Sequence, residues 1–369
     1  EYGFNLDVNI PDGLDFNKLE SLKSKIENSF KAIVDIKNEN FKNRVYVVTK
    51  PFDDSVKYAP IFVKPWELYI GQTYYYEPVI VSMKTDPHLL YSGITNSGKT
   101  LALLIALTNL TYHYSKEIEL YLAQISSKKD LRKFSNLKQT KYFATTPHKA
   151  ELMFKYLYNE IIRRNNLFNS IKDEYIDNIF DYNEKFKQDK LPFIYLATDE
   201  FAAYMKSSFD TDQTSEWKDH CLDYLLSIIR EGRSCGVYLL VSLQRPDQQS
   251  LPAVLKSQFN TKIIFRQPNT ASSLVVCDDG SATTLKNREA FCITNEGRKL
   301  MKTVYLDNDL MMKYLQKNIE KNHKFIDIQQ KFEINEEKLQ KYNKNKEKII
   351  NFNKNTKKKL SNQINIGDL

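Results

Sequence analysis

The fold of this chain is decided by the stretch His88-Leu-Leu-Tyr-Ser-Gly93-Ile-Thr-Asn-Ser-Gly98-Lys99-Thr100-Leu-Ala-Leu103. A short apolar run ends in Gly-x-x-x-x-Gly-Lys-Thr, and an apolar run typical of a helix follows at once. This is the strand–loop–helix context of a phosphate-binding P-loop. A flexible turn before a buried helix is the alternative, but the chain has only ten glycines and two stand at this spacing. The stretch therefore predicts a nucleoside triphosphate site.

Each position of this loop has an expected role. Backbone N–H groups and the positive end of the new helix would face the phosphates. Lys99 would reach the β- and γ-phosphates, and the Thr100 hydroxyl would complete a Mg²⁺ shell. The residues expected to contact the nucleotide are Gly93, Ile94, Thr95, Asn96, Ser97, Gly98, Lys99, Thr100 and Leu101.

A second motif, Pro192-Phe-Ile-Tyr-Leu-Ala-Thr-Asp199-Glu200-Phe201, places two carboxylates at the end of an apolar run. Asp199 would hold the Mg²⁺ shell, and Glu200 would orient and deprotonate the attacking water. An isolated Asp-Glu after a strand is usually only a solvated loop start. Because this pair follows a P-loop by about a hundred residues, we favour the hydrolytic interpretation.

The third element, from Arg230 to Pro246, contains Arg233, Gln244 and Arg245. Arg230 and Arg233 form a pair at a helix end, where their positive charges could simply stabilise the C-terminus of the helix. One of them could also supply an arginine finger to a neighbouring subunit's γ-phosphate. Gln244, at the carboxyl end of a predicted strand, would lie where such a sheet places its ligand and could sense the γ-phosphate. Spacing alone leaves these alternatives open.

Length and composition set limits on the domain organisation. The chain has 369 residues, enough for two or three units, and no apolar run reaches the length of a membrane span. Four cysteines form no C-x-x-C pair, which suits a reducing compartment and argues against structural zinc. The residues from Met311 onward contain fourteen Lys and seven Asp or Glu, so most of the net charge of +8 lies there.

Near-continuous apolar strands alternating with helices predict an α/β fold, with a mostly parallel sheet covered on both faces. Predicted helices include 149–164 and 216–230, and Gly71 is expected in a hairpin turn. We expect a small α/β unit over 1–58, an ATPase motor over 59–309, and a Lys/Asn-rich helical or disordered tail over 310–369. Predicted strands of the sheet are Ile118–Ile125, Pro192–Thr198, Gly236–Leu243, Thr261–Phe265, Ala290–Thr294 and Lys302–Leu306.

The three motifs, followed by Leu251–Phe265, resemble in order the motor domain of FtsK/SpoIIIE-type DNA translocases. The Lys/Asn/Tyr-rich composition and the N-terminal unit look most like the coupling proteins of Gram-positive conjugative elements (TcpA-like). The resemblance implies a RecA-like P-loop core that forms a hexameric ring and pumps double-stranded DNA with ATP and Mg²⁺.

Carried over position by position, the resemblance assigns a role to each motif residue. Lys99 and Thr100 match the Walker A pair, and Asp199 and Glu200 match the Walker B pair. Gln244 matches the sensor glutamine, and Arg233 the trans-acting finger, although Arg230 is the alternative finger. Arg245 and Lys256 match basic DNA-contacting positions of the pore loops.

Three departures from the family pattern stand out. The next basic pore positions are here Thr270 and Leu274, so Arg266 is expected to compensate. An acidic-Pro-Lys stretch is replaced by Gln124-Ile-Ser-Ser-Lys-Lys-Asp130, and the tail lacks a counterpart of the winged-helix module that reads orientation sequences. The last departure favours a conjugative role over chromosome partitioning.

The expected function is therefore ATP-hydrolysing DNA translocation by the motor of a conjugative coupling protein. Such a motor would lie at the cytoplasmic face of the cell membrane, anchored through segments outside this chain, with relaxosome or secretion-system proteins as partners. The isolated chain can be a monomer even if its active form is a ring, because the interface between neighbouring subunits is small without DNA and nucleotide. The alternatives are a related ring ATPase acting on protein or chromosomal DNA, and a nucleotide-gated adaptor without productive turnover.

Overall fold

A computed structural model describes most of the chain, which forms a compact unit of residues 1–325 and a second unit of residues 326–369. Each is described by itself. In the second unit, residues 328–332 are helical. Among the described residues, no helix combines the length and the apolar character needed to cross a membrane. The described residues are 3–39, 42–50, 55–126, 128–171, 175–244, 246 and 253–332.

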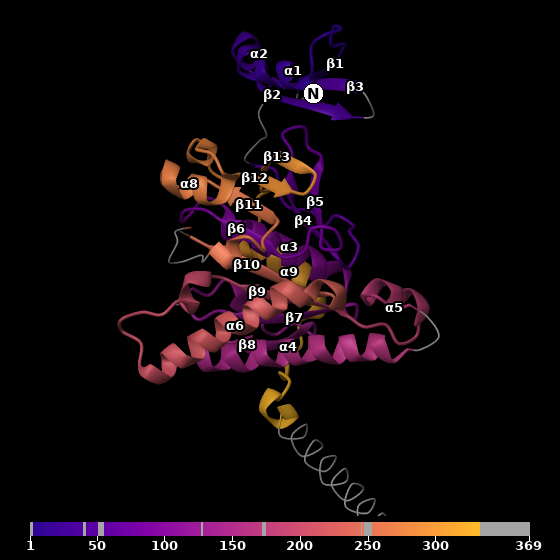
Figure 1. Ribbon diagram of the computed structural model, residues 1–369, viewed down its shortest axis with the longest axis vertical. Coiled ribbons are helices and arrows are strands. Elements are labelled where there is room, and N and C mark those ends of the chain that lie inside the picture. Colours follow the sequence, from indigo (N-terminus) through magenta and orange to yellow (C-terminus); the bar gives the residue numbers. More distant parts are fainter. Residues whose placement is uncertain are drawn as a thin grey trace, which may run out of the picture. The chain divides into compact units, whose positions relative to one another are not determined.

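A large mixed sheet forms the centre of the first unit (Figure 1). Its strand order is β5-β4-β13-β12-β11-β6-β10-β9-β7-β8. The strands from β11 to β8 in this order pair in parallel, and the others pair antiparallel. The predicted mostly parallel sheet is thus confirmed. The strands are β4 Glu67–Gln72, β5 Pro78–Ser82, β6 Leu89–Ser92, β7 Ile118–Ala123, β8 Thr140–Ala144, β9 Phe193–Thr198, β10 Val237–Leu243, β11 Thr261–Phe265, β12 Glu289–Thr294 and β13 Gly297–Lys302.

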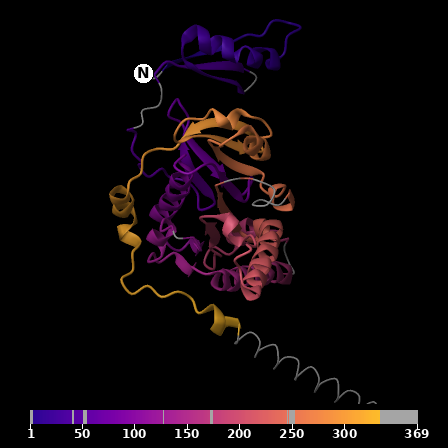
Figure 2. The same ribbon diagram turned by 90° about the vertical axis from the view of Figure 1, so that its left-hand side faces the viewer.

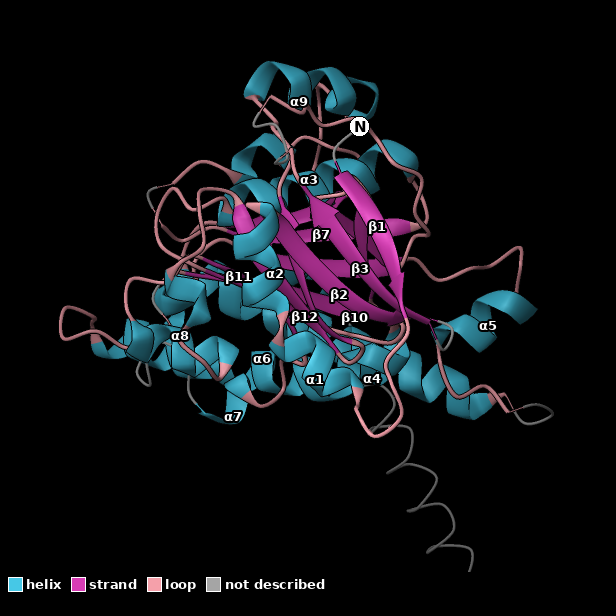
Figure 3. Cartoon of the chain, turned by 90° about the horizontal axis from the view of Figure 1, so that it is seen from above, coloured by secondary structure: helices cyan, strands magenta, loops and turns pink. Residues whose placement is uncertain are grey.

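Helices cover both faces of this sheet (Figure 3). On one side α3 (Lys99–His113) packs against β4, β6, β10 and β11, and α9 (Asn308–Leu315) lies over it. On the other, α4 (Pro147–Ser170) and α6 (Asp212–Cys235) pack against each other and against β8 and β10. Both long helices start at a threonine whose hydroxyl accepts a backbone N–H, and α6 ends at Gly236 with φ 69°. The shorter helices are α5 (Ile179–Lys185), α7 (Ala253–Lys256) and α8 (Thr270–Cys277).

Two local predictions were wrong, and one strand was missed. Gly71 lies inside β4 rather than in a turn, and a glycine is needed there because an added Cβ would stand 2.6 Å from the Lys302 carbonyl oxygen of the neighbouring strand. The last strand is β13, Gly297–Lys302, instead of Lys302–Leu306, because the chain reverses at Gly297, where φ is 119°. Finally, β8 has no counterpart among the predicted strands.

The N-terminal residues form a second sheet of three antiparallel strands, in the order β1-β3-β2. Helices α1 (Phe16–Ser21) and α2 (Lys23–Phe30) pack against it. Val34, Ile36, Val45 and Val47 form its buried core. The strands are β1 Gly3–Val8, β2 Ile33–Glu39 and β3 Lys42–Val48.

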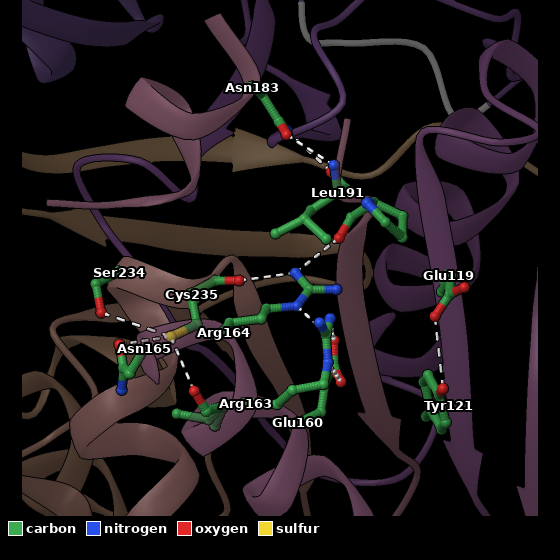
Figure 4. Close-up of polar contacts among 12 residues, drawn as sticks. Glu119, Tyr121, Glu160, Arg163, Arg164, Asn165, Asn183, Leu191, Ser234 and Cys235 are labelled. Atoms are coloured by element: carbon green, nitrogen blue, oxygen red, sulfur yellow. Dashed lines mark hydrogen bonds and ion pairs between the residues drawn. The ribbon is translucent and has the colours of Figure 1, made fainter. Parts of the chain in front are cut away.

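A buried guanidinium fixes the start of β9 and the end of α6. Arg164, on α4, donates to the carbonyl oxygens of Pro192 at 2.9 Å and Cys235 at 2.8 Å, and pairs with Glu160 at 2.8 Å. Figure 4 shows its side chain reaching from α4 toward Cys235 and the segment at Leu191. A buried cation is tolerated when it is paired and its donors are used. Arg164 therefore holds in place the edge of the sheet where α6 ends.

The segment after β13 belongs to the compact first unit as far as Phe325. It runs along the side of the sheet domain (Figure 2), with Met311 and Leu315 buried and α9 against α3. Asn318 donates to the Thr111 carbonyl oxygen. The Nε2 atom of His323 lies 2.6 Å from the Thr140 carbonyl oxygen. The expected tail began at residue 310, but residues 310–325 pack on the core. Residues 333–369 lie outside the described part of the chain.

Candidate nucleotide site

The P-loop lies between β6 and α3, as predicted. Two glycines permit its close turns: a Cβ on Gly93 would stand 2.6 Å from Cβ of Phe265, and Gly98 has φ 111°. Gly98 directly precedes Lys99, the first residue of α3, so the helix N-terminus points its N–H groups toward the loop. The sequence thus builds an anion cradle at the carboxyl edge of the parallel strands.

Lys99 is buried inside this cradle, with a fractional exposure of 4%. Among the described residues, its Nζ has no hydrogen-bond partner. Burial lowers the pKa of Lys99 to about 8, while nearby Glu200 and Asp199 act in the opposite direction. A buried ammonium without an acceptor is costly unless a ligand supplies one. This orphaned cation fits the phosphates of a nucleotide.

We expect Lys99→Met to stabilise the nucleotide-free protein at pH 7, by on the order of 1–3 kcal/mol, while abolishing nucleotide binding. The folded pKa, about 8, lies below the value of 10.5 for an unburied lysine. Between these values the unfolded state binds more protons, so wild-type stability rises with pH and the advantage of the variant shrinks.

Urea unfolding without nucleotide, at pH 7 and at about pH 9.5, would measure this difference. Exposed Lys129 provides the control substitution Lys129→Met. A Lys99→Met variant less stable than wild type at pH 7 would contradict the assigned burial cost.

Asp199 and Glu200, the predicted Walker B carboxylates, come next to the P-loop because β9 and β6 both pair with β10. Buried Asp199 accepts hydrogen bonds from Gln124 Nε2 at 3.0 Å and Ser126 Oγ at 2.5 Å. Both donors follow β7, in the stretch where the sequence departs from the family pattern. These bonds orient the carboxylate predicted to bind Mg²⁺.

Glu200 is held on both carboxylate oxygens. Its Oε1 accepts from the backbone N–H of Gln244 at 3.3 Å, and its Oε2 lies 3.6 Å from Nζ of Lys128. The Gln244 side chain in turn accepts from the Thr95 hydroxyl at 3.3 Å. A continuous polar chain therefore runs from the P-loop through the predicted sensor to the predicted base.

A cavity of about 650 Å³ opens at these residues. Its P-loop wall contains seven of the nine residues predicted to contact nucleotide, with Gly93 and Ser97 outside the lining. The opposite wall was missed from sequence, because its residues come from the segments flanking β12 and β13 and belong to no motif. The guanidinium of Arg288 there lies 6.0 Å from the Tyr305 ring centroid. The opposite wall consists of Asn287, Arg288, Tyr305 and Leu306.

These residues fit ATP and Mg²⁺ chemically. The P-loop N–H groups and Lys99 would bind the phosphates, and Thr100 with Asp199 would hold the metal ion. The ion, when bound, neutralises phosphate charge. Among the described residues there is no cluster of three or more His, Cys, Asp or Glu that would form a separate metal site.

Arg233 lies at the amino end of the parallel strands, opposite the end that carries the P-loop. It is an exposed residue at the end of α6, where β10 begins, and it donates to the Lys84 carbonyl oxygen at 3.3 Å. The seven residues of β10 separate it from Gln244, roughly 20 Å along the strand. The structure therefore does not bring Arg233 to the P-loop of its own chain. Arg230 is exposed on the same helix.

Of the predicted DNA-contacting residues, the two that the structure describes lie at opposite ends of β11. Lys256 ends α7, before the start of β11, and pairs with Asp278 at 3.7 Å. Arg266 directly follows β11 at the opposite end of that strand, exposed, and its carbonyl oxygen accepts from the N–H of Ile94 in the P-loop. Arg245 lies outside the described residues.

Sequence comparison gives a family. A model of the FtsK/SpoIIIE family matches residues 63–248, just over half of the chain. The DNA translocase FtsK of Clostridium tetani is 28% identical over 213 residues, which are 56% of this chain and 27% of the relative. The DNA translocase SpoIIIE of Bacillus subtilis is 27% identical over 228 residues, 59% of this chain and 28% of the relative. The chain thus spans little more than a quarter of these curated relatives.

Comparison with solved structures gives the fold. The pCW3 conjugation coupling protein TcpA, in its monomer form with ATPγS, superposes with a TM-score of 0.66 and 20% identity, covering 85% of this chain and 88% of that chain. The cytoplasmic domain of the Thermomonospora curvata Type VII secretion ATPase EccC superposes with a TM-score of 0.59 and 19% identity. The match covers 75% of this chain and 34% of that chain. At such identities the likeness shows a shared P-loop ATPase architecture.

Proposed function

The chain belongs to the FtsK/SpoIIIE family of P-loop ATPases, and we propose that it is the ATP-driven motor of a conjugative coupling protein that translocates double-stranded DNA. One observation carries the proposal: the polar chain from Thr95 through Gln244 to Glu200 connects the phosphate cradle to the hydrolytic carboxylate. The names of the sequence relatives, DNA translocases, support DNA as the substrate. The structural match to TcpA, a conjugation coupling protein, covers 88% of that chain and supports the conjugative role.

The residues suggest how hydrolysis would proceed. Lys99 and the loop N–H groups bind and orient the triphosphate, while Thr100 and Asp199 hold Mg²⁺. Glu200 accepts a proton from the attacking water. Because the Gln244 backbone contacts Glu200 and its side chain contacts the P-loop, a change at the γ-phosphate can reach the carboxyl end of β10.

In the proposed active form, six copies make a ring at the cytoplasmic face of the membrane, and Arg233 of one copy reaches the nucleotide of the next. Arg245, Lys256 and Arg266 would contact the DNA backbone. Phosphate contacts carry no sequence information, which suits a motor that must move along any DNA. Relaxosome or secretion-system proteins are the proposed partners, and the basic C-terminal residues are a candidate docking arm for them.

A related ring ATPase that moves protein is the second candidate, because the fold is also shared with a Type VII secretion ATPase. The two functions differ in what activates hydrolysis. A DNA motor assembles on duplex DNA and hydrolyses ATP faster there, whereas a protein motor responds to its polypeptide substrate.

We expect duplex DNA of any sequence to raise the ATPase rate of the chain at least severalfold. The stimulation should weaken between about 50 and 200 mM salt, because phosphate contacts release counterions. Displacement of a third strand from a DNA triplex, with ATP but not with ATPγS, would report translocation. Lys99→Ala is the inactive control. A rate unchanged by duplex DNA over a wide range of protein concentration would exclude this function and favour the protein motor.

A further inference from the structure

Lys128 stands between the hydrolytic carboxylate and the nucleotide cavity. Its Nζ lies 3.6 Å from Glu200 Oε2, and the residue also lines the cavity together with Lys99 and Thr100. It follows β7 on the segment whose Gln124 and Ser126 orient Asp199. One short segment thus contacts both Walker B carboxylates.

The position of Lys128 restrains Glu200 in the nucleotide-free protein. A general base must offer a lone pair to the water that it deprotonates. Here one oxygen of Glu200 accepts from the Gln244 N–H and the other is paired with an ammonium group. Glu200 is therefore held in a resting arrangement.

A bound triphosphate would compete for the same ammonium group. The Lys128 side chain is 32% exposed and sits on a flexible four-carbon stem, so it is free to reorient within the cavity. A terminal phosphate carries more negative charge than a single carboxylate and offers several acceptor oxygens. Lysine acts on phosphate as a point charge and needs no fixed bidentate geometry.

We propose that Lys128 is a positioning residue that pairs with Glu200 when no γ-phosphate is present and moves to the γ-phosphate when a triphosphate binds. The exchange frees Glu200 for the attacking water only when there is a phosphate to attack. This inference rests on the proposed nucleotide site, but it does not depend on DNA as the substrate. A partly exposed ion pair without consequence is the competing explanation, because ion pairs in contact with solvent commonly contribute little.

A double-mutant cycle on nucleotide binding separates the two explanations. We expect Lys128→Met to weaken ATPγS binding roughly fivefold to tenfold and to leave ADP binding within about twofold, because only ATPγS presents a γ-phosphate. Glu200→Gln should tighten ATPγS binding. The gain in affinity should be roughly threefold larger when Lys128 is intact than in the Lys128→Met background. ADP should show no such coupling.

Two further variants test the chemistry. Lys128→Arg retains the cation and should restore the preference for ATPγS over ADP to within about threefold of wild type. Lys129→Met removes the neighbouring exposed lysine, which lies outside the cavity lining, and should change neither affinity.

Equal effects of Lys128→Met on both nucleotides, or additive effects of the two substitutions on ATPγS, would overturn the exchange. These measurements contain no DNA. Normal coupling together with an ATPase rate insensitive to DNA would therefore refute DNA translocation and leave the role of Lys128 standing. If wild type binds neither nucleotide, the nucleotide site fails, and this inference fails with it.

Discussion

Glu200→Gln is expected to lower the single-turnover rate of ATP hydrolysis by about 10²- to 10⁴-fold, the usual contribution of a positioned general base. The amide keeps the shape of the side chain and can still accept the hydrogen bond that the Gln244 N–H donates at 3.3 Å. What it loses is the charge and the basicity needed to take a proton from water. Affinity for ATPγS should not fall, since Glu200 is an anion beside the phosphate site and its neutralisation removes repulsion.

Two measurements are needed to check this. Rapid-quench hydrolysis with enzyme in excess isolates the chemical step, and fluorescence titration with an ATP analogue gives the affinity. Glu231→Gln is a matched control, because Glu231 is exposed on α6 and outside the cavity lining. If Glu200→Gln hydrolysed ATP within about tenfold of wild type, Glu200 would not be the base.

The core of this site could be predicted because its chemistry is local. The P-loop glycines, Lys99 and Thr100 are adjacent in sequence, and Asp199 and Glu200 follow an apolar strand. Parallel strands that pair with β10 must bring these two groups to one edge of the sheet. The resemblance to the FtsK/SpoIIIE family, now confirmed, rests on the same local motifs.

The remaining walls of the site could not be predicted, because they depend on contacts between distant segments. Gln124 and Ser126 meet Asp199 across more than seventy positions, and their stretch looked only like a departure from the family pattern. Arg288 and Tyr305 reach the cavity because the chain reverses at Gly297. Nothing in the local pattern of these residues signals a ligand.

The segment 310–325 shows how composition can mislead. It contains four Lys and two Asn, and the sequence suggested that it begins a helical or disordered tail. In α9, Met311 and Leu315 are buried and Tyr314 packs on Tyr58 and Tyr112, but the helix has only 8 residues, too short a stretch to establish a helical period from sequence. Asn318 is buried through its hydrogen bond to Thr111, which polarity alone would not indicate.

Arg233→Ala is expected to lower DNA-stimulated ATP hydrolysis by about 10³-fold, as the loss of an arginine finger does. In its own chain, Arg233 is separated from the P-loop by the length of β10 and contacts the Lys84 carbonyl oxygen instead. If it stabilises a γ-phosphate, that phosphate belongs to another copy. Nucleotide binding by the isolated chain should therefore be unchanged, and Arg230→Ala, on the same exposed helix end, should retain most activity.

Mixing inactive variants tests this directly, because a head-to-tail ring builds each site from two copies. An equimolar mixture of Arg233→Ala and Lys99→Ala would contain about one intact P-loop and finger pair in four, so recovery up to about a quarter of wild-type activity is expected. In a control mixture, Arg233→Ala is combined with the double variant Lys99→Ala/Arg233→Ala. Neither protein then has the finger, so no ATPase activity should return. Recovery with the first mixture alone would assign Arg233 to its neighbour's site. An Arg233→Ala protein that is active by itself, with Arg230→Ala inactive, would move the finger one helical turn back along α6.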